Sequence, residues 1–187
     1  GYEAASVSLI ASELGITKGA LYKHYKNKRD IFDSIVERMH QIDAERAKKY
    51  QVPEETFDKS PLAYRNTGLD KIKDFIEAQF QFWIEDEFAG NFRKMLTLEQ
   101  YRNPEVEDLY QKCLGSGPVS YIEDLFREMM DQGILIKANP RVLALEFYGP
   151  FYLLLSISDT MSDKKEAARL LTAQIDGFVE RYAVHLK

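Results

Sequence analysis

The stretch that decides the fold is IASELGITKGALYKHYKNKRDIF, residues 10–32. Ala11 is a small side chain that a second helix can cross closely, and Gly15 tolerates the left-handed backbone of a tight turn. Thr17 can cap the helix that follows, and Leu21 stands where an apolar side chain points back into the interior. The spacing therefore predicts a helix-turn-helix, a motif whose second helix lies in the major groove of DNA.

The charge of the chain is distributed unevenly around this motif. Residues 1–50 carry nine Lys and Arg against seven Asp and Glu, whereas the rest carries sixteen against twenty-three, and the net charge is -5. Cationic contacts to phosphates supply much of the affinity of DNA-binding proteins. A basic head on an acidic body is typical of a nucleic-acid binder with a separate second function, although a solvated basic surface is the plainer alternative.

The remainder of the chain is predicted to be helical, because apolar residues recur at three- and four-residue spacing and β-branched alternation is missing. Helices are expected over residues 7–14, 18–25, 28–50, 69–87, 91–98, 103–114 and 119–132, after the Asn139–Pro140 cap, and after a capping box of Asp163 and Glu166. Residues 51–68, rich in Pro, Ser, Thr and Asn, are the expected linker. The fold class is therefore all-α, with a DNA-binding domain at 1–45 and a helical ligand-sensing and dimerisation domain at 46–187.

The N-terminal segment resembles the DNA-binding segment of the TetR (tetracycline-repressor) family. The matching positions are Gly1-Tyr2, Ser6, Ile10-Ala11, Gly15, Thr17-Lys18-Gly19, Leu21-Tyr22, His24-Tyr25 and Lys28, over about a sixth of the chain. The resemblance implies a ligand-responsive transcriptional regulator, a repressor released from its operator by a small molecule. Family members carry a further helix before the Gly-Tyr pair, so an upstream segment is expected to cover Leu9, Leu14 and Leu21.

The same resemblance, together with the local positive charge, identifies expected DNA contacts. These positions are Ser6, Thr17, Lys18, Gly19, Ala20, Tyr22, Lys23, His24 and Lys28. Ser6 and Thr17 are also ordinary helix caps, and Ala20 could touch a base edge or a thymine methyl group. Lys28 gains from the affinity of a helix N-terminus for phosphate. The alternative for Tyr22 and His24 is a pair of half-buried aromatic side chains.

Two further sites are expected in the C-terminal domain. The helix over 142–157 is apolar on more than one face, which predicts a homodimer built from the last two helices. The interface is expected at Leu154, Leu171, Ile175, Phe178 and Tyr182. A surplus of aromatic side chains predicts a pocket for a small apolar or aromatic ligand, with a solid aromatic core as the alternative. Its expected lining is Phe82, Phe88, Met95, Tyr121, Phe147 and Phe151.

Other functions find less support in the sequence. His24, His40 and His185 share no metal-ligand spacing, and neither a metal nor another cofactor is expected. Cys113, the single cysteine, has no evident base beside it. The two competing functions are an all-helical enzyme and a small-molecule-binding module without DNA binding. The apolar run 147–158 is too short to span a bilayer and no signal peptide is visible, so a cytoplasmic location is expected.

Overall fold

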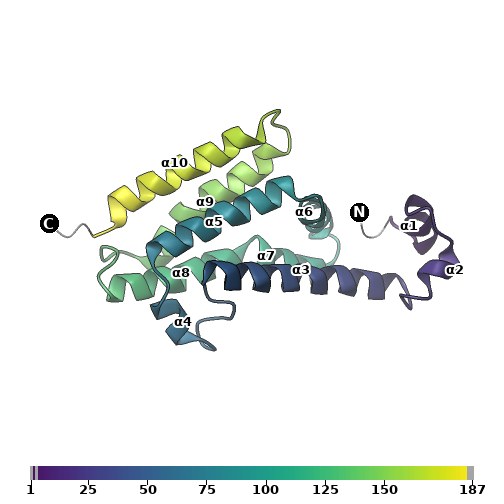
Figure 1. The fold of residues 1–187 in the computed structure, drawn as a ribbon, viewed down its shortest axis with the longest axis horizontal. Helices are drawn as coiled ribbons and strands as arrows, with labels where there is room; N and C mark the ends of the chain where they lie inside the picture. Colours follow the sequence, from purple (N-terminus) through teal and green to yellow (C-terminus); the bar gives the residue numbers. More distant parts are fainter. Residues whose placement is uncertain (1, 3, 185–187) are drawn as a thin grey trace.

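The computed structural model describes residues 2 and 4–184, so Gly1 and His185 lie outside the described residues. Within the described ranges the fold consists of helices joined by short connections (Figure 1). The helices are α1 (Val7–Glu13), α2 (Lys18–Leu21), α3 (Lys28–Tyr50), α4 (Pro61–Arg65), α5 (Leu69–Glu85), α6 (Glu87–Glu99), α7 (Pro104–Cys113), α8 (Ser116–Asp131), α9 (Pro140–Ser158) and α10 (Lys164–Tyr182). An antiparallel bridge between Leu135 and Ala183 closes the end of α10 against the turn after α8. The predicted all-α fold class is confirmed.

The molecule is elongated, with a small head at one end and a helical body at the other. α1 and α2 form the head, and α3 runs from it along one edge of the body (Figure 1). Phe32 and Met39 of α3 are buried in the same core as the body helices. Residues 45 and 46, the expected domain boundary, fall inside α3. One continuous helix therefore joins the head to the body.

Polar caps start the long helices where the sequence places them. Asn27 Oδ1 accepts a hydrogen bond from the Asp30 amide at 2.9 Å, and Asn139 Oδ1 accepts one from the Val142 amide at 3.1 Å. Asp163 caps α10 through the amide of the second helical residue, at 2.9 Å. Glu166 was expected to complete a capping box with Asp163. Its amide donates to the backbone carbonyl of Asp163 and not to the side chain. Each cap satisfies an amide that helix geometry leaves without a partner.

Two segments expected to be irregular are partly helical. The expected linker 51–68 contains α4, and Tyr64 within it is buried and donates its hydroxyl to the Glu55 carbonyl at 3.0 Å. This segment is therefore packed against the body. α8 begins at Ser116, inside the Gly-Ser-Gly-Pro run, because proline is tolerated in the first helical turn, where its missing N–H has no intrahelical acceptor. A Cβ at Gly117 would lie 2.2 Å from the Lys112 carbonyl oxygen, so glycine permits the close approach of α7 and α8.

The centre of the body is an aromatic cluster from three helices. The ring of Phe178 on α10 lies 5.4 Å from that of Phe126 on α8 and 4.9 Å from that of Phe147 on α9. All three side chains are essentially inaccessible to solvent. Close-packed rings of this kind bury large apolar areas, and they lock α8, α9 and α10 together.

α9 continues through Pro150 without a break. Because proline has no N–H, the Glu146 carbonyl four residues earlier loses its usual helical donor. Gln174 of α10 donates its side-chain amide to that carbonyl at 3.4 Å. The Glu146 carboxylate also accepts from the Tyr182 hydroxyl at 2.8 Å and pairs with Arg181 at 2.9 Å. The proline therefore frees a polar group that ties the last two helices to each other.

The expected dimer residues require a correction. Leu171, Ile175 and Phe178 are fully buried within the chain's own core, and Leu154 is nearly so. Tyr182 is partly buried. The apolar stripe of α10 packs inward because α5, α8 and α9 already cover it. The exposed apolar side chains of the last two helices are instead Val142, Leu145, Tyr152, Leu153, Ile157 and Leu170.

Candidate DNA-binding head and ligand cavity

Side-chain caps begin both helices of the head. Ser6 Oγ accepts from the Leu9 amide and Thr17 Oγ1 accepts from the Ala20 amide, each at 3.1 Å. Between the two helices Gly15 has a φ of 65°, the left-handed region that a Cβ disfavours. The turn predicted from the sequence is therefore confirmed.

The contact between the two helices also follows the prediction. Ala11 of α1 and Leu21 of α2 are buried, so the small side chain admits the crossing helix and the leucine fills the space behind it. Of the three leucines expected to need cover, Leu21 is buried, whereas Leu9 and Leu14 are exposed. Ile16 is exposed beside them. The outer surface of the head thus contains apolar as well as basic side chains.

The second helix is shorter than the pattern predicts, since it ends at Leu21 and does not reach Tyr25. Beyond it, the Lys23 amide donates to the Ala20 carbonyl at 3.2 Å, and the His24 amide donates to the Leu21 carbonyl at 3.1 Å. Hydrogen bonds across three residues are usual where an α-helix tightens and stops. A single helical turn has too few bonds to propagate without tertiary support.

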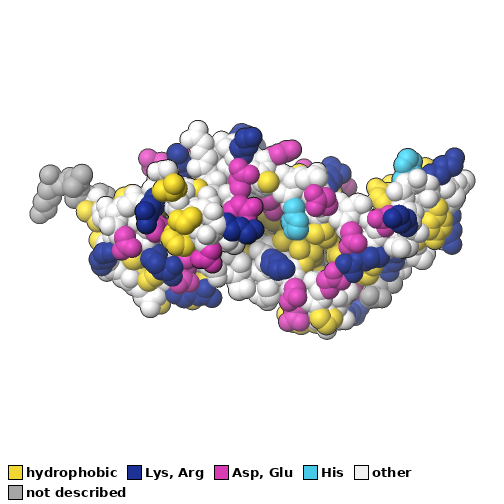
Figure 2. Space-filling model, turned by 90° about the horizontal axis from the view of Figure 1, so that it is seen from below, with side chains coloured by type: hydrophobic (Ala, Val, Ile, Leu, Met, Phe, Trp, Pro, Cys, Tyr) yellow, Lys and Arg dark blue, Asp and Glu magenta, His cyan; other side chains and the backbone are white. Residues whose placement is uncertain are grey.

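The expected DNA-contact residues belong to the head and to the start of α3, and Figure 2 shows Lys and Arg side chains at this end of the molecule. Those that are exposed are Ser6, Thr17, Lys18, Gly19, Tyr22, Lys23 and His24, whereas Ala20 and Lys28 are partly buried. The Lys18 ammonium lies 5.7 Å from the centre of the Tyr22 ring, and the Lys28 ammonium lies 4.2 Å from that of Tyr2. These contacts hold cations and aromatic rings side by side. Their contacts with DNA remain a prediction.

Arg29 does not add to this basic surface. Its guanidinium makes a two-pronged pair with the Glu105 carboxylate, and its Nε donates to Asp33 Oδ1 at 2.7 Å. Hydrogen bonding to Arg29 lowers the pKa of Glu105, and the same contact raises the pKa of Arg29. The pair joins the first turn of α3 to the first turn of α7, so it links the head end of α3 to the body.

A cavity of about 890 Å³ lies in the body. Its lining residues come from six helices and the 51–60 connection: His40, Asp43, Ala44, Ala47, Pro53, Glu54, Glu55, Thr56, Lys59, Tyr64, Phe75, Ile76, Gln79, Trp83, Lys112, Cys113, Gly117, Pro118, Ser120, Tyr121, Ile122, Asp124, Tyr148 and Phe151. In Figure 2, hydrophobic side chains are visible in a recess near the middle of the molecule. The volume lies within the range of about 300–1,000 Å³ usual for small-molecule sites.

The tyrosines of the cavity wall are fixed by backbone carbonyls. Tyr121 donates its hydroxyl to the Pro53 carbonyl at 3.1 Å, and Tyr148 donates to the Leu114 carbonyl at 2.9 Å. Burial raises the pKa of both hydroxyls, so both rings stay neutral. The rings therefore present apolar faces to the cavity while their polar ends are satisfied in the wall.

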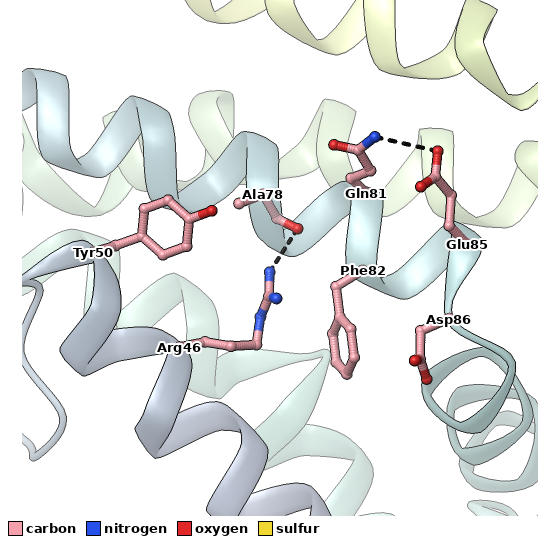
Figure 3. Close-up of a pocket in the computed structure, with 7 residues that line it drawn as sticks. All are labelled: Arg46, Tyr50, Ala78, Gln81, Phe82, Glu85 and Asp86. Atoms are coloured by element: carbon pink, nitrogen blue, oxygen red, sulfur yellow. Dashed lines mark hydrogen bonds between the residues drawn. The ribbon is translucent and has the colours of Figure 1, made fainter.

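A polar network crosses the cavity wall between α3 and α5. Gln79 donates its amide to Asp43 Oδ1 at 3.4 Å, and its carbonyl oxygen accepts from Arg46 Nε. Arg46 also donates to the Ala78 carbonyl at 2.6 Å, as Figure 3 shows, and its guanidinium lies 4.5 Å from the centre of the Phe82 ring. Arg46 thereby fixes the orientation of Gln79. Burial raises the pKa of Asp43 above its ordinary value, against the opposing effects of Gln79 and Arg46.

Cys113 faces the same cavity from α7. Burial, and next the negative charge of Asp43, raise the pKa of its thiol to about 12. The thiol is therefore protonated at neutral pH, which makes it a poor nucleophile.

Only part of the expected pocket lining belongs to this cavity. Tyr121 and Phe151 line it, and Phe147 lies in the aromatic core behind it. Phe82 lines a smaller hollow of about 380 Å³ with Arg46, Tyr50, Ala78, Gln81, Glu85 and Asp86 (Figure 3). Phe88 packs on Phe92 and beneath Arg38, and Met95 packs against the core. Neither Phe88 nor Met95 lines either hollow.

Sequence reasoning missed the residues that give the cavity its chemistry. Asp43, Gln79, Trp83 and Tyr148 were not among the expected lining. A signal for the α3 wall exists in retrospect: the cavity residues of α3 are spaced three, one and three apart, which places them on one helical face. That face contains two alanines and a charged residue, so no apolar stripe marks it.

Among the described residues, no group of three or more His, Cys, Asp or Glu side chains could hold a metal ion. Within the same ranges, no helix has the length and hydropathy needed to cross a bilayer.

Comparisons with known proteins agree with the geometry. Residues 1–35 match the family model for bacterial regulatory proteins of the tetR family. SmeT, the repressor of the Stenotrophomonas maltophilia multidrug efflux pump SmeDEF, is 19% identical in its triclosan complex, over 98% of this chain and 84% of that chain, with a TM-score of 0.67. FadR from Bacillus subtilis in complex with stearoyl-CoA is 20% identical, over 99% and 91%, with a TM-score of 0.62. A TetR-family regulator from Pectobacterium atrosepticum is 21% identical, over 100% and 88%, with a TM-score of 0.57.

The capped head and the helical body together define a helix-turn-helix transcriptional regulator. Residues 1–35 match the tetR family model, and the whole chain shares its all-helical fold with the compared regulators. The matched family model and the compared structures are those of transcriptional regulators.

Proposed function

We propose that this protein is a homodimeric, cytoplasmic repressor that binds operator DNA through its head and releases it when a small molecule enters the 890 Å³ cavity. The observation that carries the proposal is that α3 contributes to both sites. Its first turn follows the recognition segment, and Asp43, Ala44 and Ala47 further along it line the cavity. SmeT and FadR, which share the fold, have structures with triclosan and stearoyl-CoA bound. No catalytic step is part of the proposed role.

A second connection between the two sites supports the proposal. α7 bears Glu105 at the end that pairs with Arg29, and Lys112 and Cys113 at the end that lines the cavity. A helix of ten residues is about 15 Å long and stiff, so a shift at the cavity end moves the Glu105 end. Ligand binding that displaces α3 relative to α7 would therefore turn the head. Such a ligand must bind the two arrangements with different affinities, and typical couplings are about 1–3 kcal/mol.

The dimer supports the DNA-binding role, because two-fold related heads read two half-sites about one helical turn, roughly 34–36 Å, apart. The proposed interface is the outer face of α9 and α10, two helices that lie side by side (Figure 1). Its apolar side chains are Val142, Leu145, Leu153, Ile157 and Leu170. Gly149 and Gly177 lie on the same faces by helical spacing, and such small residues permit close approach of helices from a second copy.

A gel-shift titration tests the proposed function. The probe is the DNA immediately upstream of the protein's own gene, and the competitor is a scrambled duplex of the same length and composition. The full chain is expected to retard the specific probe, and Lys18→Ala is expected to weaken that binding. Lys165→Ala, which removes an exposed lysine at the start of α10 and outside the head, is the matched control. Equal affinity for both duplexes, unaffected by Lys18→Ala, would rule out DNA binding through this head.

A further inference from the structure

The chemistry of the cavity narrows the class of its ligand. Asp43 projects from α3 into the wall, and its only hydrogen bond in the described part of the chain is the long one from Gln79. No Lys, Arg or His among the described residues forms an ion pair with it. Arg46, three residues further along α3, is occupied by the Ala78 carbonyl and by Gln79, with its face on Phe82. A partly buried carboxylate that has one long hydrogen bond and no ion pair favours a cation in the cavity next to it.

The other charged groups of the cavity do not offset this carboxylate. Lys59 is paired with Glu55 at 2.9 Å. Lys112, at the α7 end, is the remaining ammonium group of the lining, and the imidazole of His40 lies one turn before Asp43 on α3. Glu54 and Asp124 line the cavity in addition, although Arg127 pairs with Asp124 at 2.6 Å. The lining therefore carries more carboxylates than ammonium groups, and its potential favours positive charge.

Aromatic side chains make up most of the remaining wall. They are Tyr64, Phe75, Trp83, Tyr121, Tyr148 and Phe151, from α4, α5, α8 and α9. Ring faces attract cations through their quadrupole, and they also bury the apolar groups of a ligand. A carboxylate set among several rings is thus suited to a charge that is carried on an apolar body.

We infer that the cavity binds a bulky hydrophobic cation, whose charged centre lies near Asp43 and whose apolar groups pack against the aromatic wall around Trp83. This inference rests on the proposed function, because it assumes that the cavity is a ligand site. It adds the charge and shape class of the ligand. A volume of about 890 Å³ accommodates an organic ion with several ring substituents.

Two ions of nearly the same size and shape but of opposite charge make the test direct. Tetraphenylphosphonium and tetraphenylborate are titrated into the purified full-length protein by calorimetry. The quenching of Trp83 is recorded in parallel, since it is the only tryptophan in the chain and lies in the cavity wall. The phosphonium ion is expected to bind at least about tenfold more tightly than the borate, because an opposite charge within about 4–6 Å shifts such equilibria by one to three decades.

Variants of one helix locate the charge that is responsible. Asp43→Asn keeps the shape of the side chain and is expected to weaken phosphonium binding at least about tenfold while leaving borate binding unchanged or stronger. Glu45→Gln removes an exposed carboxylate of the same helix outside the cavity, and is expected to change phosphonium binding by less than about twofold, as for screened surface charges. Circular dichroism and melting temperature confirm that each variant is folded.

The possible outcomes separate the inference from the proposed function. Equal binding of both ions, or a phosphonium affinity that Asp43→Asn leaves unchanged, overturns the cationic ligand class while the cavity remains a ligand site. Binding of neither ion, with no quenching of Trp83, overturns the cavity as the ligand site and the inference with it. A gel shift that shows no DNA binding would overturn the role proposed for the head. The calorimetric test of the cavity is independent of that result.

Discussion

Replacing one exposed leucine and one buried phenylalanine of the last two helices separates the proposed dimer interface from the core. Leu153 of α9 is 60% exposed, whereas Phe178 of α10 is 0% exposed and lies among three other rings. Leu153→Glu is expected to dissociate the dimer and leave each chain helical. Phe178→Ala is expected to destabilise the fold itself.

The magnitudes follow from what each side chain contacts. Burying a leucine completely is worth about 1.5–3 kcal/mol, so covering the exposed part of Leu153 is worth about 1–2 kcal/mol in each copy. Two-fold symmetry doubles this to about 2–4 kcal/mol, a factor of about 30–800 in the dissociation constant, before the cost of desolvating two carboxylates is added. Phe178→Ala removes a whole ring from a packed core, which typically costs about 3–5 kcal/mol of unfolding free energy.

Sedimentation equilibrium at micromolar concentration measures the association, and circular dichroism during heating measures the fold. Leu98→Glu is the matched control, because Leu98 is 63% exposed on α6, away from the proposed interface. It should leave both association and helicity unchanged. A Leu153→Glu variant that sediments as the wild-type dimer would refute the assignment of this face. So would a Phe178→Ala variant that dissociates into monomers while keeping its melting temperature.

Three further predictions concern charged side chains. Lys18→Ala should lower the dependence of DNA affinity on salt by roughly one unit of logarithmic slope, measured by titrations at several salt concentrations; an unchanged slope would exclude a phosphate contact. Asp159→Ala should lower the unfolding free energy by about 3–5 kcal/mol in urea titrations, because it strips the buried Arg93 of a two-pronged partner at 2.7 and 3.0 Å. Hydrogen bonding to Arg93 lowers the pKa of Asp159 in the folded state below its ordinary value of 3.8. The ion pair therefore stabilises the fold fully above pH 3.8, and this stabilisation is lost as the pH falls through the pKa of the folded state. Acid titrations of Asp159→Ala should lack this loss of stability. Burial raises the pKa of Asp43, so the folded state holds the carboxyl proton more tightly than the unfolded chain does. The folded state therefore loses stability as the pH rises above 3.8. Asp43→Asn should raise the melting temperature at pH 7, by an amount that shrinks towards pH 4.

Local chemistry was sufficient to predict the head. The caps at Ser6, Thr17 and Asn27 and the left-handed turn at Gly15 depend on interactions within a few residues, and all four are observed. The starts of α9 and α10 follow for the same reason, since a cap and its acceptor are neighbours in sequence. The length of α2 does not follow, because tertiary support decides whether one helical turn continues.

Tertiary packing decided which faces of the helices are inside. Phe178 belongs to an apolar stripe that fits a core as well as a dimer interface, and only the positions of α8 and α9 make it core. Asp43 stands on a helical face with no apolar stripe, so periodicity gives no reason to place it in a cavity. It becomes a site residue because α5, α7 and α8 close around it. A sequence determines the caps, turns and faces of its helices through short-range contacts, whereas the burial of each face depends on helices that lie far away along the chain.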